Sequence, residues 1–118
     1  MALASSASCA PHAIDPHPWK WYDVAGEAAV AGVMAMDYVQ TVQIVEDGYE
    51  GNPLIGKHGE RLHPNFYFPV TLMVHAALCW FLPQPARGAT QFMTFSIEAI
   101  TVWDNRVDGY SPWPWKMR

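Results

Sequence analysis

Three long apolar stretches of this chain each contain ionisable side chains. Glu27 and Asp37 lie in the first stretch, His75 lies in the second and Glu98 lies in the third. Each stretch approaches the length of about 20 residues that crosses a bilayer, where ionisable groups are costly and face the interior of a bundle. A chain with this pattern must therefore gather these side chains away from its apolar surface.

Helix-ending residues separate the apolar stretches. We expect helices over residues 23–47, 64–82 and 86–105, ended by Gly48, by Pro83 and by the glycine and prolines after residue 108. The stretches are longer than usual strands, are rich in Ala, Met and Leu, and show no period-two alternation. The sequence therefore predicts an all-α fold: a three-helix transmembrane bundle, with a short extra or re-entrant helix at 53–58.

Polar residues recur at helical spacing within each stretch, which places them on one face of each helix. These positions are Glu27, Asp37, Gln40 and Thr41 in the first stretch, Thr71, His75 and Cys79 in the second, and Gln91, Thr94, Glu98, Thr101 and Asn105 in the third. Three such helices can meet with the polar faces inward and the apolar faces outward. Cys79 on this face is expected to be a small buried hydrophobe.

We therefore predict one shared polar cluster, to which the connection between the first two helices also contributes. Its expected members are Glu27, Asp37, Gln40, Thr41, Glu50, Asn52, Asn65, His75, Glu98 and Asn105. A cluster of this kind can serve a ligand, or its members can simply hydrogen-bond one another. The residues do not decide between these two roles.

Composition favours a membrane location. Hydrophobic residues make up 51% of the chain and charged residues only 15%, which is lean in charge for a soluble domain. Trp and Tyr gather near the ends of the expected helices, as they do at membrane interfaces. We expect a multi-pass protein of the cell (inner) membrane, with the lipid bilayer as its partner and a homo-oligomer left open. A soluble three-helix domain is the alternative.

The tails and the charge complete this organisation. Residues 1–18 are expected to be a flexible tail without the pattern of a cleaved signal peptide, 19–108 the helical membrane domain, and 109–118 a C-terminal tail. The net charge of −4, with seven Lys and Arg, argues against a nucleic-acid surface. The distribution of Lys and Arg favours an external N-terminus and a cytoplasmic C-terminus.

A short block after the first helix has a clear local meaning. Asn52 suits a helix N-cap, Pro53 suits the first helical position, and Gly56 can supply a left-handed stop. Together with the polar positions, this YExNPxxG block resembles a family of small, uncharacterised polytopic membrane proteins of bacterial and tailed-phage genomes. The residues that carry the resemblance are Glu27, Asp37, Gln40, Thr41, Tyr49, Glu50, Asn52, Pro53, Gly56, Asn65, Tyr67, Phe68, His75, Leu82, Pro83, Glu98 and Asn105.

The resemblance covers about residues 24–106 and implies a membrane location and a bundle of three or four helices. It implies no biochemical activity. The chain contains no GxSxG, HExxH, Walker or dinucleotide-binding glycine motif, so no enzyme class is indicated. The primary interpretation is thus a membrane protein with a buried polar cluster, without a cofactor or a metal site.

Three further hypotheses remain open. Glu27, Asp37, His75 and Glu98 are ligand types for a carboxylate-rich metal-dependent enzyme in a helical bundle, although the expected Glu-x-x-His pair is absent. Polar faces that line an opening after oligomerisation would suit a holin-like or envelope-modifying phage lysis protein. The polar cluster could also form the pocket of a small-molecule binding protein or accessory subunit.

Overall fold

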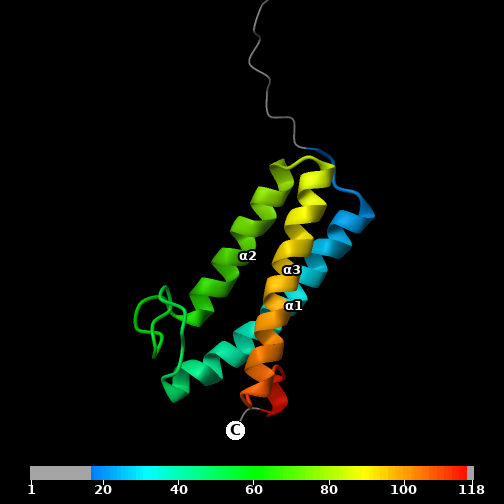
Figure 1. Cartoon of the computed structure of the whole chain (residues 1–118). Helices are drawn as coiled ribbons and strands as arrows, with labels where there is room; N and C mark the ends of the chain where they lie inside the picture. Colours follow the sequence, from blue (N-terminus) through cyan, green and yellow to red (C-terminus); the bar gives the residue numbers. More distant parts are fainter. Residues whose placement is uncertain (1–16, 117–118) are drawn as a thin grey trace, which may run out of the picture.

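A computed structural model describes residues 17–116 and shows an all-α three-helix bundle (Figure 1). The helices are α1 (Trp21–Asp47), α2 (Pro64–Phe81) and α3 (Gln84–Val107), followed by the short 3-10 helix η1 (Pro114–Lys116). Leu82 and Pro83 join α2 to α3 in a tight hairpin, and α1 begins at the same end of the bundle as this hairpin (Figure 1). The prediction of three helices is confirmed, and their bounds lie close to those expected.

Local sequence explains where the helices begin and end. Gly48 follows α1 with a left-handed φ of 75°, and its N–H donates to the Val45 carbonyl. Before α2, His63 accepts a hydrogen bond from the Asn65 N–H at 3.2 Å through Nδ1. Prolines at the starts of α2 and α3 fit because a first-turn N–H has no partner within its helix.

The short helix expected at 53–58 is a single turn. Asn52 Oδ1 accepts from the Leu54 N–H at 3.0 Å, and the Asn52 carbonyl accepts from the Gly56 N–H at 2.9 Å. The chain then leaves the turn at Gly56, where φ is 81° and a Cβ atom would lie 2.6 Å from the Glu60 carboxylate. The predicted cap and stop are present, but they enclose too few residues for a helix.

The bundle buries many polar side chains and exposes many large apolar ones, which is the reverse of the distribution in a typical soluble domain. The buried apolar cluster is small and consists of Val30, Met34, Ile55 and Phe68. The buried residues also include charged and amide side chains, notably Asp23, Asp37, Gln40, His75, Arg87 and Gln91. Large apolar residues instead lie on the outside, and Phe92, Met73 and Trp103 are each at least 70% exposed.

Within the described residues, α1 alone is long and apolar enough to cross a membrane by length and composition. The buried core helix of a soluble protein, or a signal sequence near the N-terminus, would have the same properties. The described residues thus show a helical bundle but not a multi-pass arrangement.

Residues near both ends of the described part of the chain contact the helices. Residues 1–16 and 117–118 lie outside the described part of the chain, so the prediction of a flexible tail falls largely outside it. His17 lies against the bundle, because its carbonyl accepts from Arg87 at 2.8 Å. At the other end of the chain, the carbonyls of Tyr110 and Ser111 accept from Gln40 and Gln43 at 3.1 and 2.7 Å. Residues 110 and 111 therefore pack on α1 although the sequence placed them in the C-terminal tail.

Candidate functional site

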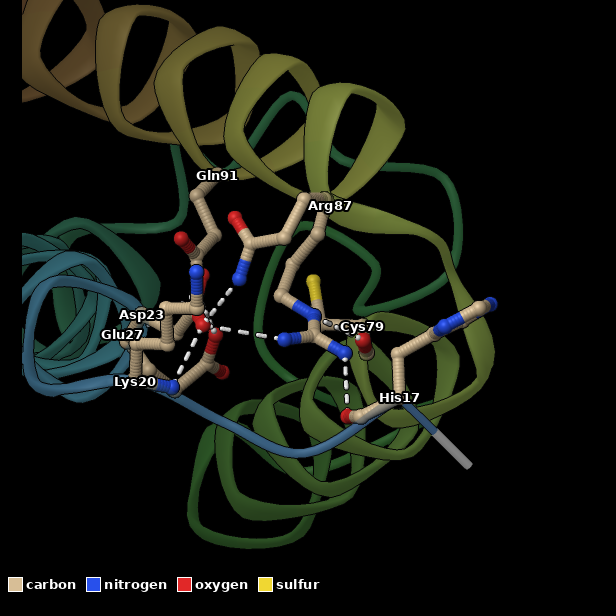
Figure 2. Close-up of polar contacts among 8 residues, drawn as sticks. His17, Lys20, Asp23, Glu27, Cys79, Arg87 and Gln91 are labelled. Atoms are coloured by element: carbon tan, nitrogen blue, oxygen red, sulfur yellow. Dashed lines mark hydrogen bonds and ion pairs between the residues drawn. The ribbon is translucent and has the colours of Figure 1, made fainter. Parts of the chain in front are cut away.

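A buried ion pair joins α1 to α3 at the hairpin end of the bundle. Arg87 is 0% exposed, and its Nη1 lies 3.0 Å from Oδ2 of Asp23 (Figure 2). The other guanidinium nitrogens are also occupied, because Nε donates to the Cys79 carbonyl at 2.7 Å and Nη2 to the His17 carbonyl. One side chain thus links both other helices to the segment before α1.

The carboxylate of Asp23 has several donors. The Lys20 backbone N–H donates to its Oδ2 at 2.7 Å, and the side-chain amide of Gln84 donates to the same atom. A buried charge is stable only when paired and hydrogen-bonded, and Asp23 meets both conditions. Three donors therefore converge on Oδ2 of Asp23.

A second buried pair lies one helical turn further along α1. His75 Nδ1 and Glu27 Oε1 are 2.9 Å apart, and Gln91 Nε2 donates to Glu27 Oε2 at 3.2 Å and to the Asp23 carbonyl at 3.0 Å. Gln91 can lie this close to α1 because residue 26 is glycine, where a Cβ atom would stand 2.5 Å from Gln91 Oε1. We call Asp23, Glu27, His75, Arg87 and Gln91 the paired network.

The opposite end of the bundle contains a cavity of about 670 Å³, which we call the acidic chamber. It lies between the second halves of α1 and α3, the loop after α1 and the start of α2. Its acidic lining residues are Asp37, Glu50, Glu98 and Asp108. Its other polar and aromatic lining residues are Thr41, Tyr49, Asn52, Tyr67, Phe68, Thr101, Asn105 and Tyr110.

Hydrogen bonds in the acidic chamber offset only part of its negative charge. Asn105 Nδ2 donates to Asp37 Oδ1 at 3.2 Å, and Glu50 Oε1 accepts from the Asn52 backbone N–H at 2.6 Å. Burial and the nearby Asp47 carboxylate raise the pKa of the Tyr110 phenol, which therefore remains neutral. Within residues 17–116, none of those that line the chamber is Lys, Arg or His. The chamber therefore favours a positively charged occupant.

The structure divides the predicted polar cluster. Asp37, Thr41, Glu50, Asn52, Glu98 and Asn105 line the acidic chamber, whereas Glu27 and His75 belong to the paired network. Glu27 and Asp37 are ten positions apart on one helix, or about 15 Å along its axis. The four ligands considered for a carboxylate-rich metal site, Glu27, Asp37, His75 and Glu98, are therefore not brought to one point.

Two predicted members of the cluster lie outside both sites. Gln40 is fully buried, and its Nε2 donates to the carbonyls of Val102 and Tyr110, each at 3.1 Å, so that it holds the chain after α3 against α1. Asn65 is exposed and accepts from the Tyr38 hydroxyl at 2.7 Å. Both residues make hydrogen bonds within the fold, and neither lines the acidic chamber.

Sequence reasoning missed the ion pair that anchors the paired network. The sequence predicts a helix start at residue 23 and assigns no partner to Asp23 or Arg87. The available signal was spacing: Arg87 stands one turn before Gln91, on the same face as the predicted polar stripe of the third helix. A cationic side chain on the inward-facing side of a helix is expected to form an ion pair with an acidic side chain of a neighbouring helix.

Comparison of the chain with protein-family models, with curated proteins and with solved structures finds no match in any of the three. The geometry of the two sites is therefore the basis for inferring a function.

Proposed function

We propose that this chain is a three-span integral membrane protein that binds a small organic cation in the acidic chamber. The observation that carries the proposal is a cavity of about 670 Å³ with four carboxyl groups and no basic residue in its lining. The membrane location and the ligand class rest on separate observations.

The outer surface of the helices supports the membrane location. Every exposed residue within 24–45, 66–81 and 85–103 is apolar, aromatic, glycine or proline. Charged side chains in these ranges point inward instead. In lipid the apolar surface needs no further partner, whereas a soluble domain would expose it all to water.

Helix length agrees with this arrangement. At 1.5 Å per residue, the three apolar ranges measure about 33, 24 and 29 Å, near the bilayer hydrocarbon thickness of about 30 Å. Aromatic residues lie at both ends: Trp19 contacts Trp80 at the hairpin end, with ring centroids 5.9 Å apart, and Trp113 stacks on Trp115 beyond α3. Such rings favour the membrane interface.

The size and lining of the acidic chamber support an organic cation over a bare metal ion. Small-molecule sites typically occupy about 300–1,000 Å³, a range that includes this chamber, whereas a metal ion needs ligands converging within about 2.5 Å of one point. Tyr49, Tyr67 and Phe68 offer aromatic surface of the kind that binds ammonium groups. The acids supply the opposite charge.

The lysis-protein hypothesis is less well supported. A lesion-forming helix must turn its polar face toward an opening shared by several copies. Here Arg87, Gln91 and Gln40 make their hydrogen bonds within one copy of the chain. These contacts favour a self-contained bundle with an internal site.

Membrane location is tested by alkaline extraction of membranes from expressing cells. We expect the full chain to remain with the membrane pellet and to need detergent for release. Recovery in the alkaline supernatant would contradict the three-span arrangement, and it would leave the binding experiment below still interpretable.

Ligand binding is tested by calorimetry on the purified full chain, with putrescine and its neutral analogue 1,4-butanediol as probes. We expect putrescine to bind and 1,4-butanediol not to bind. Glu98→Gln and Asp37→Asn should each weaken putrescine binding about tenfold, the effect of losing one charge-assisted contact. Glu46→Gln, which removes an exposed α1 acid outside the chamber, is the matched control. Equal binding of both probes, or unchanged binding by Glu98→Gln, would overturn the ligand assignment.

A further inference from the structure

A buried thiol lies beside the paired network and takes no part in its ion pairs. Cys79 lies one helical turn after His75 on α2, and its thiol is completely buried. Its Sγ is 3.9 Å from both ring nitrogens of His75, and His75 Nδ1 is 2.9 Å from Glu27 Oε1. One ligand atom from each of these three residues lies within 4.8 Å of the other two.

We propose that Glu27, His75 and Cys79 form a metal site for Zn²⁺ or a similar divalent ion. The site lies at the hairpin end of the bundle and is independent of the acidic chamber and of its ligand. It also differs from the carboxylate-rich set considered from sequence, because it takes a thiolate and excludes Asp37 and Glu98.

The spacing of the three ligand atoms fits tetrahedral coordination. Zn²⁺ binds nitrogen and oxygen at about 2.0–2.2 Å and sulfur at about 2.3 Å, which sets the edges of a tetrahedron at about 3.3–3.6 Å. The observed 2.9 Å between nitrogen and oxygen and 3.9 Å between sulfur and nitrogen lie on either side of this range. Metal binding here therefore requires small rotations of the three side chains.

The ligand types fit the charge and softness of Zn²⁺. Thiolate, imidazole and carboxylate are its usual protein ligands. As the metal–sulfur bond forms, the Cys79 thiol releases its proton to solvent. One thiolate and one carboxylate then balance the two positive charges, so the occupied site is neutral, as a buried site with an apolar surround requires.

Neighbouring groups hold the ligands in place. Gln91 Nε2 donates to Glu27 Oε2 and leaves Oε1 directed at His75. Arg87 Nε donates to the backbone carbonyl of Cys79 at 2.7 Å and fixes the end of α2 that carries the thiol. Hydrogen bonds of this kind orient metal ligands. With three ligands from the described residues, the fourth position is left for water or another small ligand.

Cobalt(II) spectroscopy on the purified full chain tests this site, because Co²⁺ replaces Zn²⁺ and reports its ligands. We expect stoichiometric Co²⁺ with visible bands of a tetrahedral ion and a near-ultraviolet band from a sulfur ligand. Addition of Zn²⁺ should remove these bands by displacement. Cys79→Ser should abolish the sulfur band, His75→Ala should abolish the tetrahedral spectrum, and Gln91→Ala should weaken Co²⁺ binding about tenfold as a positioning residue.

Cys9→Ser is the matched control, since Cys9 is the other cysteine of the chain, and it should leave the spectrum unchanged. Circular dichroism of Cys79→Ser, which keeps a small polar group at the same position, shows whether the bundle remains folded. A sulfur band that survives Cys79→Ser, or wild-type protein without a tetrahedral spectrum, would overturn the metal site. Neither result would affect putrescine binding, which tests the acidic chamber separately.

Discussion

At the hairpin end of the bundle the buried acids each lie beside a basic side chain, whereas among the described residues at the other end four carboxyl groups line a cavity without one. Asp23 has Arg87, and Glu27 has His75. Asp37 and Glu98 have each other and the amide of Asn105 as neighbours, and no cation lines their chamber. The same three helices thus bury charge in two ways.

The charged side chains at the two ends therefore have different expected roles. Those of the paired network stabilise the bundle, and those of the acidic chamber bind the proposed cation. Paired charges hold helices together, and removal of one partner leaves the other buried alone. Unpaired acids around a cavity destabilise the protein without a ligand, and sites of this kind are retained for function at a cost in stability. Variants at the two ends should therefore change stability in opposite directions.

The largest expected effect is at the paired network. Arg87→Leu leaves Asp23 without its cation and the carbonyls of His17 and Cys79 without a donor. We expect the free energy of unfolding in detergent to fall by about 3–5 kcal/mol. Circular dichroism during denaturant titration measures this change.

Arg106→Leu is the matched control, because it removes an exposed cation from the same helix, and it should change stability by less than about 0.5 kcal/mol. The double variant Asp23→Leu/Arg87→Leu should recover part of the loss, since no unpaired charge remains. Equal effects of the two single Arg variants would show that the paired network does not stabilise the bundle.

The second-largest expected loss of stability is for a variant at the contact between α1 and α3. Gly26→Ala places a Cβ atom 2.5 Å from Gln91 Oε1, so the amide must move and its hydrogen bonds to α1 must lengthen. We expect a loss of about 1–3 kcal/mol, as for an overpacked core. Gly88→Ala introduces the same methyl group on α3 with no atom within 4 Å. It should be neutral or stabilising by up to about 1 kcal/mol, because alanine favours helix. Similar losses for the two variants in thermal unfolding would contradict the close approach at Gly26.

Removing carboxyl groups from the acidic chamber should raise the free energy of unfolding, whereas the variants above that disturb the paired network should lower it. The double variant Asp37→Asn/Glu98→Gln keeps side-chain size and removes two adjacent carboxyl groups. Without ligand we expect it to be more stable than wild type by about 1 kcal/mol, in the range found when functional strain is removed. Denaturant titration of ligand-free protein measures this. A loss as large as that of Arg87→Leu would show that these carboxyl groups are structural.

The smallest effect is expected for a polar contact that belongs to neither end. Tyr38→Phe removes the hydroxyl that donates to exposed Asn65 at 2.7 Å. Water replaces the lost partner, so the unfolding free energy should change by about 0.5 kcal/mol or less. Putrescine binding in the same variant should match wild type; weaker binding would place Asn65 in the chamber's function, as the sequence first suggested.

The helices were predictable because their signals are local. Gly48, Pro64 and Pro83 act on the backbone next to them, and the stripe that contains Gln91 and Glu98 follows from helical period alone. Asn52 likewise caps the turn that its side chain predicted. The prediction of a single polar cluster did not rest on local signals. It required knowledge of which helix faces pack together and of how far along each helix they make contact.

Local signals in the sequence specify three helices, their approximate ends and the polar residues of their inner faces, because caps, breakers and the 3.6-residue period act within a few residues. The packing of the helices then divides these inner faces into two sites. The distance between Glu27 and Asp37 along α1 keeps them apart, and the approach of α3 at Gly26 brings Arg87 and Gln91 to the first of them. Contacts between residues more than 60 positions apart depend on how whole helices pack, and no short stretch of the chain contains that information.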